Sequence, residues 1–507
     1  MTMAQAPLRV VSPLDGSVVA EIERTPPAEM ETLLRAAAGA QHAWAATPLA
    51  ERLATIRRCR KAFHARVDKL VDAVRRETGK PMAEILGGEI IANLELFDFY
   101  LKHAAKLLAP ERVPINPINY PGKRGSIEHR ALGVVGVLSS WNYPVALPMR
   151  AIVPALVAGN AVAFKPSVDA SLIGRELAQV FIETLPKDLL VVGYGGREVS
   201  AVVIEHADKI NFIGSVGVGK EVAKRCGERL IPCSTELSGK DVAIVLADAP
   251  FERALNGVLW GAFTNAGQNC ASIERLYVED AIYDRFVPAL VERVKKLRTG
   301  ADVGPLRNDK QMKLVEDHVR NARDTGCRIL AGGERVGTSL FFQPTVIEVA
   351  DRNATFMVEE TFGPTLPIVR VRDAEEAIAE ANRAKFGLTG SIWTADLARG
   401  EALARRLEVG VAMVDNCVFS GALASAPWGG VKDTGHGVTN SKYGLLEMTR
   451  PAFLLIDRSS GAKETWWYPY GDDLTKLMRA VVSQLGGNLL ALLKLPFLLK
   501  RVLSRQV

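Results

Sequence analysis

Cysteine is scarce in this chain, with six among 507 residues, and no two of them form a CxxC pair. Their spacing, taken with that of the seven histidines, matches no zinc-binding pattern. We therefore expect no metal centre and no disulfide framework, and favour a reduced cytoplasmic chain. The cysteines are Cys59, Cys226, Cys233, Cys270, Cys327 and Cys417.

Two kinds of hydrophobic segment are also missing. The first residues, MTMAQAPLRVVSPLDG, lack the basic and apolar regions of a secretory signal peptide. The apolar run near the C-terminus is short and is interrupted by Lys494 and Pro496. Since a spanning helix needs about 20 apolar residues, we expect no transmembrane segment.

Acidic residues are absent from residues 474–507, which hold six lysines and arginines. The whole chain has a net charge of +6, so the body before this tail is neutral and nucleic-acid binding is not expected. The leucines and cations of the tail suit an interfacial anchor on anionic lipid. We favour such a peripheral contact, on the inner face of a membrane, and keep packing of the tail on a partner subunit as the alternative.

The length of the chain predicts two or three domains. Residues 27–110 space their apolar side chains as helices do. From residue 129 onward, short β-branched runs such as GVVGVLSS and KINFIGS alternate with helical segments, and a second such series follows Cys270. Strands that alternate with helices predict an α/β fold with parallel sheets.

Polar motifs follow several of the expected strands, where α/β proteins place their sites. Asn142 of SSWNYP suits an oxyanion donor, Lys165 of KPS suits a ribose or phosphate contact, and Glu236 of ELSGK suits a general base. Taken singly, each has a plain structural explanation: a turn asparagine, an exposed lysine and a solvated glutamate.

Three further motifs are equally ambiguous alone. NFIGSVGVGKEV could bind phosphate at a helix start, but Gly214, Gly217 and Gly219 do not have the GxGxxG spacing, and a tight turn explains them as well. VEETFGP could be a charged loop. A single cysteine such as Cys270 in TNAGQNCAS is more typical of packing than of chemistry.

In their order along the chain, seven motifs resemble the successive signatures of the NAD(P)-dependent aldehyde dehydrogenase superfamily. They are SSWNYP, KPS, FIGSVGVGK, ELSGK, GQNCAS, EETFGP and PWGGVKDTGHG, and the resemblance covers roughly residues 10–455. It implies a Rossmann-like cofactor domain, an α/β catalytic domain, a small β bridging element and a homodimer or homotetramer. The expected boundaries are 1–120 and 139–239 for the cofactor domain, 240–432 for the catalytic domain, 121–138 and 433–458 for the bridging element, and 459–507 for a basic amphipathic tail.

The resemblance also implies residue roles. Cys270 is the expected nucleophile, forming a thiohemiacetal and then a thioester, so its site must promote the thiolate. Glu236 would activate the water that hydrolyses the thioester, and Asn142 would stabilise the oxyanion together with the Cys270 backbone N–H. The expected cofactor contacts are Trp141, Lys165, Ser167, Gly214, Ser215, Leu237, Glu360 and Phe362.

Departures from the family pattern bear on cofactor choice. Members that prefer NAD often carry a glutamate three residues after the lysine, where it repels a 2′-phosphate, but this chain has Val168 there and Asp169 next. Both NAD and NADP stay open, and NAD is favoured. Ser140, Ser238 and Val438 stand where proline, glycine and arginine are usual.

The expected reaction is oxidation of an aldehyde to its carboxylic acid, since relatives that transfer the acyl group to coenzyme A generally lack the glutamate found at position 236. The tail, and a resemblance to the branch that holds carotenoid-dialdehyde enzymes, favour an apolar aldehyde that is long-chain, aromatic or terpenoid. A succinate-semialdehyde-type enzyme is the alternative, although no arginine pair suited to a carboxylate stands out. A non-catalytic, membrane-associated scaffold of the same fold is the third possibility.

Overall fold

The computed structural model describes residues 6–117, 119–459, 464–468 and 470–504. The chain forms two compact units: Met1–Leu108 with Arg130–Arg450, and Ala109–His129 with Pro451–Val507. Parts of the predicted tail, residues 460–463, 469 and 505–507, lie outside the described residues.

The first unit opens with a short hairpin and a set of helices that confirms the helical prediction for residues 27–110. α3 ends at Gly79, whose φ of 70° is left-handed and suits glycine. Between α4 and α5 the chain forms a π-helical turn at Ile85–Ile91, a geometry that is frequent at functional sites. The elements are β1 (Leu8–Val11), β2 (Val18–Ile22), α1 (Pro27–Ala46), α2 (Leu49–Ala65), α3 (Val67–Thr78), α4 (Met82–Glu84) and α5 (Ala92–Leu107).

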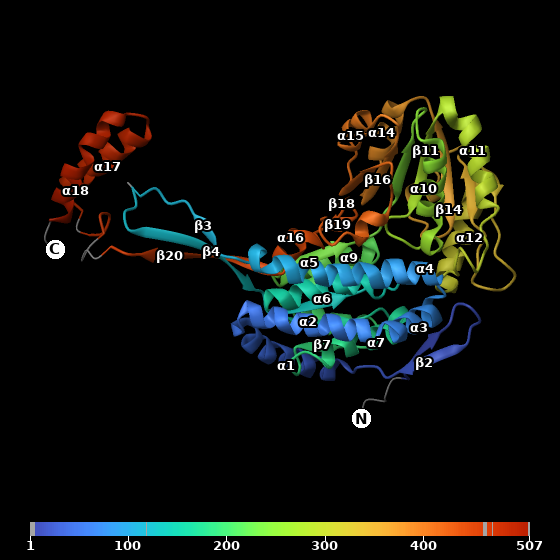
Figure 1. Ribbon diagram of the computed structural model, residues 1–507, viewed down its shortest axis with the longest axis horizontal. Coiled ribbons are helices and arrows are strands. Elements are labelled where there is room, and N and C mark those ends of the chain that lie inside the picture. Colours follow the sequence, from blue (N-terminus) through green and yellow to red (C-terminus); the bar gives the residue numbers. More distant parts are fainter. Residues whose placement is uncertain (1–5, 118, 460–463, 469, 505–507) are drawn as a thin grey trace. The chain divides into compact units, whose positions relative to one another are not determined.

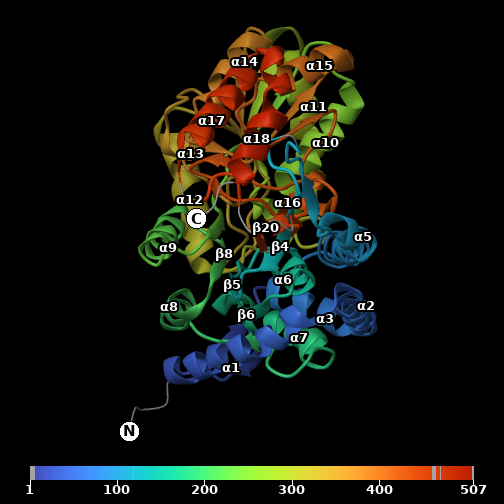
Figure 2. The ribbon, with the colours of Figure 1, turned by 90° about the vertical axis from the view of Figure 1, so that its left-hand side faces the viewer.

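A six-stranded sheet follows, in the order β19-β9-β8-β5-β6-β7, with β5 to β9 parallel and β19 antiparallel on the edge. Figure 2 shows α8 and α9 on one side of its strands, with α6 and α2 on the other. Because both faces are covered, β5, β6 and β8 are buried at every position. The elements are β5 (Val134–Leu138), α6 (Ala146–Ala158), β6 (Ala161–Lys165), α7 (Ser171–Ile182), β7 (Leu190–Val192), α8 (Arg197–His206), β8 (Lys209–Ile213), α9 (Val216–Glu228), β9 (Cys233–Glu236) and β19 (Gly435–His436).

The second sheet has seven strands in the order β12-β13-β14-β11-β10-β16-β17, and only the β12–β13 pair is antiparallel. Figure 1 shows α10 and α11 alongside β11 and β14. The prediction of an α/β fold with parallel sheets is confirmed. The elements are β10 (Asp241–Val245), α10 (Phe251–Phe263), β11 (Ile273–Glu279), α11 (Asp280–Val294), α12 (Asp309–Asp324), β12 (Arg328–Ala331), β13 (Thr345–Glu348), α13 (Thr355–Val358), β14 (Thr365–Val371), α14 (Ala374–Asn382), β16 (Thr389–Trp393), α15 (Leu397–Ala404) and β17 (Val411–Val414).

Short elements complete the first unit: β15 (Phe386–Gly387) pairs with β18 (Val431–Lys432), and α16 (Ser441–Leu446) precedes the second unit. The predicted domain boundaries stay predictions. β19, which falls within the predicted bridging segment 433–458, pairs with β9 of the six-stranded sheet.

The second unit combines a three-stranded sheet, in the order β20-β4-β3, with a helical hairpin. Lys123 on β4 forms ion pairs with Asp457 and Glu464. Leu474, Leu477 and Val502 form the small core of the hairpin. The elements are β3 (Glu111–Val113), β4 (Lys123–Ala131), β20 (Thr449–Asp457), α17 (Asp472–Leu485) and α18 (Leu495–Leu503). Within the described part of the chain, no helix is both long and apolar enough to cross a membrane.

Candidate active site

Cys270 lies on a strained loop between α10 and β11. Asn265 and Ala266 have φ values of 53° and 54°, and Gly267 has 68°. A side chain at Gly267 would come within 2.0 Å of the Gly363 carbonyl oxygen, so only glycine fits there. Left-handed backbone in non-glycine residues is costly, and it collects at functional sites.

The Cys270 thiol points at a buried carboxylate. Its Sγ lies 3.2 Å from Oε1 of Glu236, at the end of β9, and the Trp428 indole donates to the same oxygen at 2.8 Å. The other oxygen, Oε2 of Glu236, is buried and has no hydrogen-bond partner among the described residues. Burying a carboxylate oxygen without a hydrogen-bond partner costs free energy. The same oxygen can accept a hydrogen bond from a donor such as water.

These surroundings favour the thiol over the thiolate. Burial, followed by the Glu236 carboxylate, raises the pKa of Cys270 well above its usual value, and only Arg150 among the main neighbours lowers it. The expectation that the site promotes the thiolate stays a prediction, because the nearest charge is negative and does not itself stabilise a thiolate. Glu236 is placed instead to accept the thiol proton.

Asn142 follows β5 and is held by a buried network. Its backbone carbonyl accepts hydrogen bonds from Lys80 Nζ at 2.5 Å and from Asn265 Nδ2 at 3.1 Å. Lys80 also pairs with the fully buried Glu89 of the π-helical turn at 2.6 Å. Glu84, in the preceding turn, accepts a hydrogen bond from the Asn265 backbone N–H at 2.9 Å. One segment thus holds both the Asn142 loop and the Cys270 loop.

A cavity of about 420 Å³ reaches Cys270 from one side. Asn142 and Glu236 line it, as do all but one of the predicted cofactor residues. The edge-to-face rings of Trp141 and Phe362, 5.5 Å apart between centroids, form part of its apolar wall. The other predicted residues in the lining are Ser167, Gly214, Ser215, Leu237 and Glu360.

Lys165 is the exception. Its Nζ donates to the carbonyl oxygens of Pro166 and Gly195, at 2.7 and 3.1 Å, and the residue is not among those that line the cavity. Burial lowers the pKa of Lys165 to about 8. These two carbonyls use two of the three N–H donors of the Lys165 ammonium group, which leaves one for a contact to a ribose.

The lining of this cavity suits a dinucleotide. Ser215 is the N-cap of α9, yet its side chain makes no capping hydrogen bond, so the N–H groups of the first turn are available to a phosphate. A side chain at Gly219 would come within 2.2 Å of Leu237, so this glycine lets α9 pack closely on the end of β9. Burial, followed by Glu274, raises the pKa of Glu360 to about 8, and Glu360 accepts the Gly239 N–H at 2.8 Å. A carboxyl group there can bond ribose hydroxyls.

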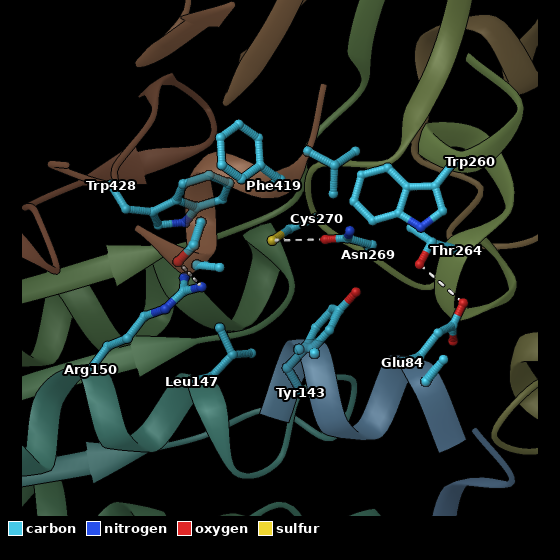
Figure 3. Close-up of a pocket in the computed structure, with 16 residues that line it drawn as sticks. Glu84, Tyr143, Leu147, Arg150, Trp260, Thr264, Asn269, Cys270, Phe419 and Trp428 are labelled. Carbon is cyan, nitrogen blue, oxygen red and sulfur yellow. Dashed lines mark hydrogen bonds between the residues drawn. The ribbon is translucent and has the colours of Figure 1, made fainter. Parts of the chain in front are cut away.

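A second cavity, of about 320 Å³, reaches Cys270 from another side, and Cys270 is the one described residue that lines both. Figure 3 shows Tyr143, Trp260, Phe419 and Trp428 around it. Arg150 also lines it, with its guanidinium carbon 5.3 Å from the Trp428 ring centroid and Nη2 donating to the Gly421 carbonyl at 2.7 Å.

The sequence analysis missed these five residues. Arg150 did carry a signal, because it is the one charged residue in the apolar run VALPMRAIVPALVAG, and α6 is buried on nearly all sides. Tyr143 and Trp428 stand in the motifs SSWNYP and PWGGVKDTGHG, whereas Trp260 and Phe419 carried no signal, because aromatic side chains on helices and loops are commonly core residues. No group of three or more His, Cys, Asp or Glu suited to a metal occurs among the described residues.

Comparisons with known proteins give the family. The sequence model of the aldehyde dehydrogenase family matches residues 2–453. The chain is 35% identical over 469 residues to a 4,4′-diapolycopene aldehyde oxidase of Methylomonas sp, covering 91% of this chain and 88% of that protein. It is 36% identical over 465 residues, and 88% of both chains, to a Mycolicibacterium smegmatis protein whose name proposes a succinate-semialdehyde dehydrogenase using NADP(+).

A solved structure agrees. The aldehyde dehydrogenase of Mycobacterium tuberculosis complexed with NAD+ superposes with a TM-score of 0.85 at 30% identity, covering 91% of this chain and 96% of that one. The chain therefore belongs to the aldehyde dehydrogenase family, and it is an oxidoreductase that uses NAD or NADP.

Proposed function

We propose that this enzyme oxidises an aldehyde to the carboxylic acid through a covalent intermediate on Cys270. The observation that carries the proposal is the position of Cys270, where two differently lined cavities meet, with Glu236 Oε1 3.2 Å from its Sγ. Splitting the oxidation at a covalent adduct replaces one difficult step with two easier ones.

In the first step Glu236 accepts the thiol proton and the Cys270 sulfur adds to the aldehyde carbon. The C–S bond forms as the carbonyl π bond opens, so negative charge collects on oxygen. Asn142 Nδ2 and the Cys270 backbone N–H stabilise that charge, and the network around Lys80 and Glu89 keeps the Asn142 loop in position. Glu236 then returns the proton to solvent.

NAD(P)+, when bound, accepts a hydride, and the residues that would hold it are Trp141, Ser167, Gly214, Ser215, Leu237, Glu360 and Phe362, with Lys165 at the edge of the site. Glu236 acts again when the acyl group is a thioester on Cys270. It takes a proton from water, and the water oxygen bonds the acyl carbon. The C–S bond then breaks as Glu236 gives this proton to the sulfur, which releases the acid and the thiol. The unpartnered Oε2 of Glu236 suits the contact with water.

We infer that NAD is preferred and NADP is accepted. Asp169 lines the cofactor cavity and Val168 does not, so the carboxylate that this chain offers to a ribose lies one position beyond the usual family glutamate. A negative charge there disfavours a 2′-phosphate, although Lys310, which also lines the cavity, offsets part of it. Rates with each cofactor, measured at one aldehyde concentration, test this preference.

The aldehyde is proposed to be apolar: long-chain, aromatic or terpenoid. Tyr143, Trp260, Phe419 and Trp428 supply the second cavity with large apolar surfaces, and one relative is named a diapolycopene aldehyde oxidase. A succinate-semialdehyde-type activity is the second candidate. Arg150 favours it, because a guanidinium in an aromatic cavity suits a carboxylate.

An aldehyde panel should separate these two candidates. We expect kcat/KM for long alkanals to exceed that for succinate semialdehyde, because the lining is largely apolar and Arg150 is already bonded to Gly421. NAD(P)H formation at 340 nm measures each rate. The reverse ranking, together with a loss of activity toward succinate semialdehyde alone in Arg150→Met, would establish the second candidate. Arg253→Met, which removes an exposed arginine bonded to the Asp415 carbonyl, is the matched control.

We also infer that the enzyme is cytoplasmic, forms a homodimer or homotetramer, and contacts a membrane through residues 474–507. α17, α18 and the turn between them expose large apolar side chains while their small core is already filled. Lys476, Arg479, Lys494 and Lys500 are exposed on the same hairpin. Apolar side chains beside cations suit the interface of an anionic bilayer. The exposed apolar residues are Val482 69%, Leu485 64%, Leu489 71%, Leu490 73%, Leu493 79% and Phe497 65%.

Liposome co-sedimentation tests the contact. The full chain should bind vesicles containing phosphatidylglycerol, less so at high salt, since each cation near an anionic surface contributes about 1 kcal/mol. A chain truncated after residue 460 and a Leu489→Glu/Leu493→Glu variant should remain in the supernatant. Leu397→Glu, which is 64% exposed on α15, is the matched control. Equal binding by the truncated chain would rule the contact out, and a changed oligomeric state on truncation would favour packing on a partner.

A further inference from the structure

Two cysteines that the proposed mechanism does not use lie on α9 and β9, at the ends of these elements that point away from the cofactor cavity. Cys226, in the last turn of α9, is fully buried, and Cys233, the first residue of β9, is half-buried. Cys233 packs against the core cluster that contains Cys226, and the turn that joins the two elements is closed by the Ile231 N–H, which donates to the Cys226 carbonyl at 3.1 Å. The two thiol side chains interact with each other across this turn. Leu230 in that turn has a φ of 56° and is 92% exposed.

A histidine completes the cluster. Nε2 of His436, on β19, lies 3.4 Å from Cys233 Sγ, and its Nδ1 lies 3.3 Å from Thr235 Oγ1. His436 pairs with Thr235 in the β9–β19 ladder, which fixes the ring beside the sulfur. The imidazole and a neighbouring thiol are the two kinds of group that stabilise a thiolate.

A lowered pKa distinguishes Cys233 from Cys226, Cys59 and Cys417. The interaction with the Cys226 thiol, supported by His436, outweighs burial and lowers the pKa of Cys233 to about 6. The same contact, together with burial, raises the pKa of Cys226. Burial raises the pKa of Cys59 to about 11 and that of Cys417 to about 12. An accessible thiolate beside a second thiol is the arrangement found at redox-sensing cysteines.

We propose that Cys226 and Cys233 form a reversible disulfide when the enzyme meets a peroxide, and that this bond alters cofactor binding. The Cys233 sulfur attacks the peroxide, the O–O bond breaks, and a sulfenic acid and one water form. The Cys226 sulfur then displaces the sulfenic oxygen, which leaves as a second water. The two thiols lose two hydrogens and two electrons in total, and hydrogen peroxide is reduced to two waters.

The position of the pair links it to the cofactor cavity. α9 begins at that cavity beside Gly214 and Ser215, and β9 ends there at Glu236. Gly219 and Leu237 are in such close contact that a Cβ on the glycine would lie 2.2 Å from Leu237. A covalent bond between the far ends of α9 and β9 constrains how they pack where they meet the cavity. This effect on affinity rests on the proposed cofactor cavity, whereas the disulfide does not.

Peptide mapping tests the disulfide in the full-length chain. Cys270→Ser removes the proposed nucleophile, so that peroxide does not oxidise it. After peroxide treatment, free thiols are blocked with iodoacetamide and the protein is digested with trypsin without reductant. Cleavage after Arg225, Arg229 and Lys240 separates the two cysteines into peptides 226–229 and 230–240. The expected product is these two peptides joined, with a mass two hydrogens lower than their sum, and separated again by dithiothreitol.

The joined peptide should be absent from Cys233→Ser and Cys226→Ala and present in the matched control, Cys59→Ser. NADH fluorescence titration of the Cys270→Ser protein should give a Kd that changes by about fivefold on oxidation, the low end of coupling between two sites. Alkylation of both cysteines after peroxide would overturn the disulfide. A joined peptide with an unchanged Kd would overturn its effect on the cofactor. Neither the peptide map nor the NADH titration depends on turnover. Both can therefore be interpreted even if Cys270 is not the nucleophile.

Discussion

Replacing Cys270 with alanine is expected to lower kcat/KM for any aldehyde by about four orders of magnitude or more, because the covalent adduct cannot form. Among the residues that the structure describes, Cys270 is the one that lines both cavities. Steady-state NAD(P)H formation measures the loss. Mass spectrometry of quenched enzyme should find an acyl adduct on the parent protein and none on the variant.

Cofactor binding separates loss of chemistry from loss of structure. Cys270→Ala should bind NADH as the parent does, since the sulfur is one small part of the cofactor cavity lining. Cys327→Ala is the matched control, because Cys327 is a buried cysteine that lines neither cavity, and its hydrogen bonds within the described residues are to Thr325 and the Ala350 N–H. Retention of aldehyde-dependent NAD(P)H formation by Cys270→Ala would refute the assignment of the nucleophile and would indicate that another residue carries the reaction.

Glu236→Gln should slow turnover by about 10²–10⁴-fold, the usual contribution of a general base. A burst of NAD(P)H close to the enzyme concentration should precede the slow phase, because the amide does not activate water and the thioester accumulates. The amide oxygen of glutamine still accepts the Trp428 hydrogen bond, so the site keeps its shape. Stopped-flow absorbance and intact mass of the acyl-enzyme measure the two effects.

The burst distinguishes the two tasks proposed for Glu236. If its main task is to take the Cys270 proton, the burst itself becomes slow and no acyl-enzyme collects. An unchanged kcat would contradict both tasks. Glu359→Gln is the matched control, because Glu359 is a neighbour of Glu360 in sequence but forms an exposed ion pair with Lys385.

Sequence patterns predicted the fold class because strands buried on both faces read as continuous apolar runs between helices. β5, β6 and β8 are buried at every position and occur as VVGVL, AVAFK and KINFI. The π-helical turn at Ile85–Ile91 could not be predicted, since nothing in ILGGEII distinguishes it from an α-helix.

The order of the motifs predicted Cys270, Glu236 and Asn142 as site residues, and in the structure all three line one cavity. The motifs could not predict that the pKa of Cys270 is raised, because the shift depends on burial and on the 3.2 Å distance from Sγ to Glu236 Oε1. Nor could they predict that Lys165 bonds backbone carbonyls, which depends on where Gly195, thirty residues later, passes the end of β6.

The two cavities that meet at Cys270 have separate walls. One is built from the loops that follow the strands of the six-stranded sheet and from the Glu360 segment, and the other from the π-helical turn, α6, α10 and the loop at Val418–Ala422. Trp428 and Tyr143 connect the two walls, because Trp428 bonds Glu236 and Tyr143 follows Asn142, whereas Trp260 and Phe419 line the second cavity alone. Substitution of Trp260 or Phe419 can therefore change the aldehyde that the enzyme accepts without changing cofactor binding. Substrate specificity can then diverge between related genes through single replacements, while the reaction stays the same.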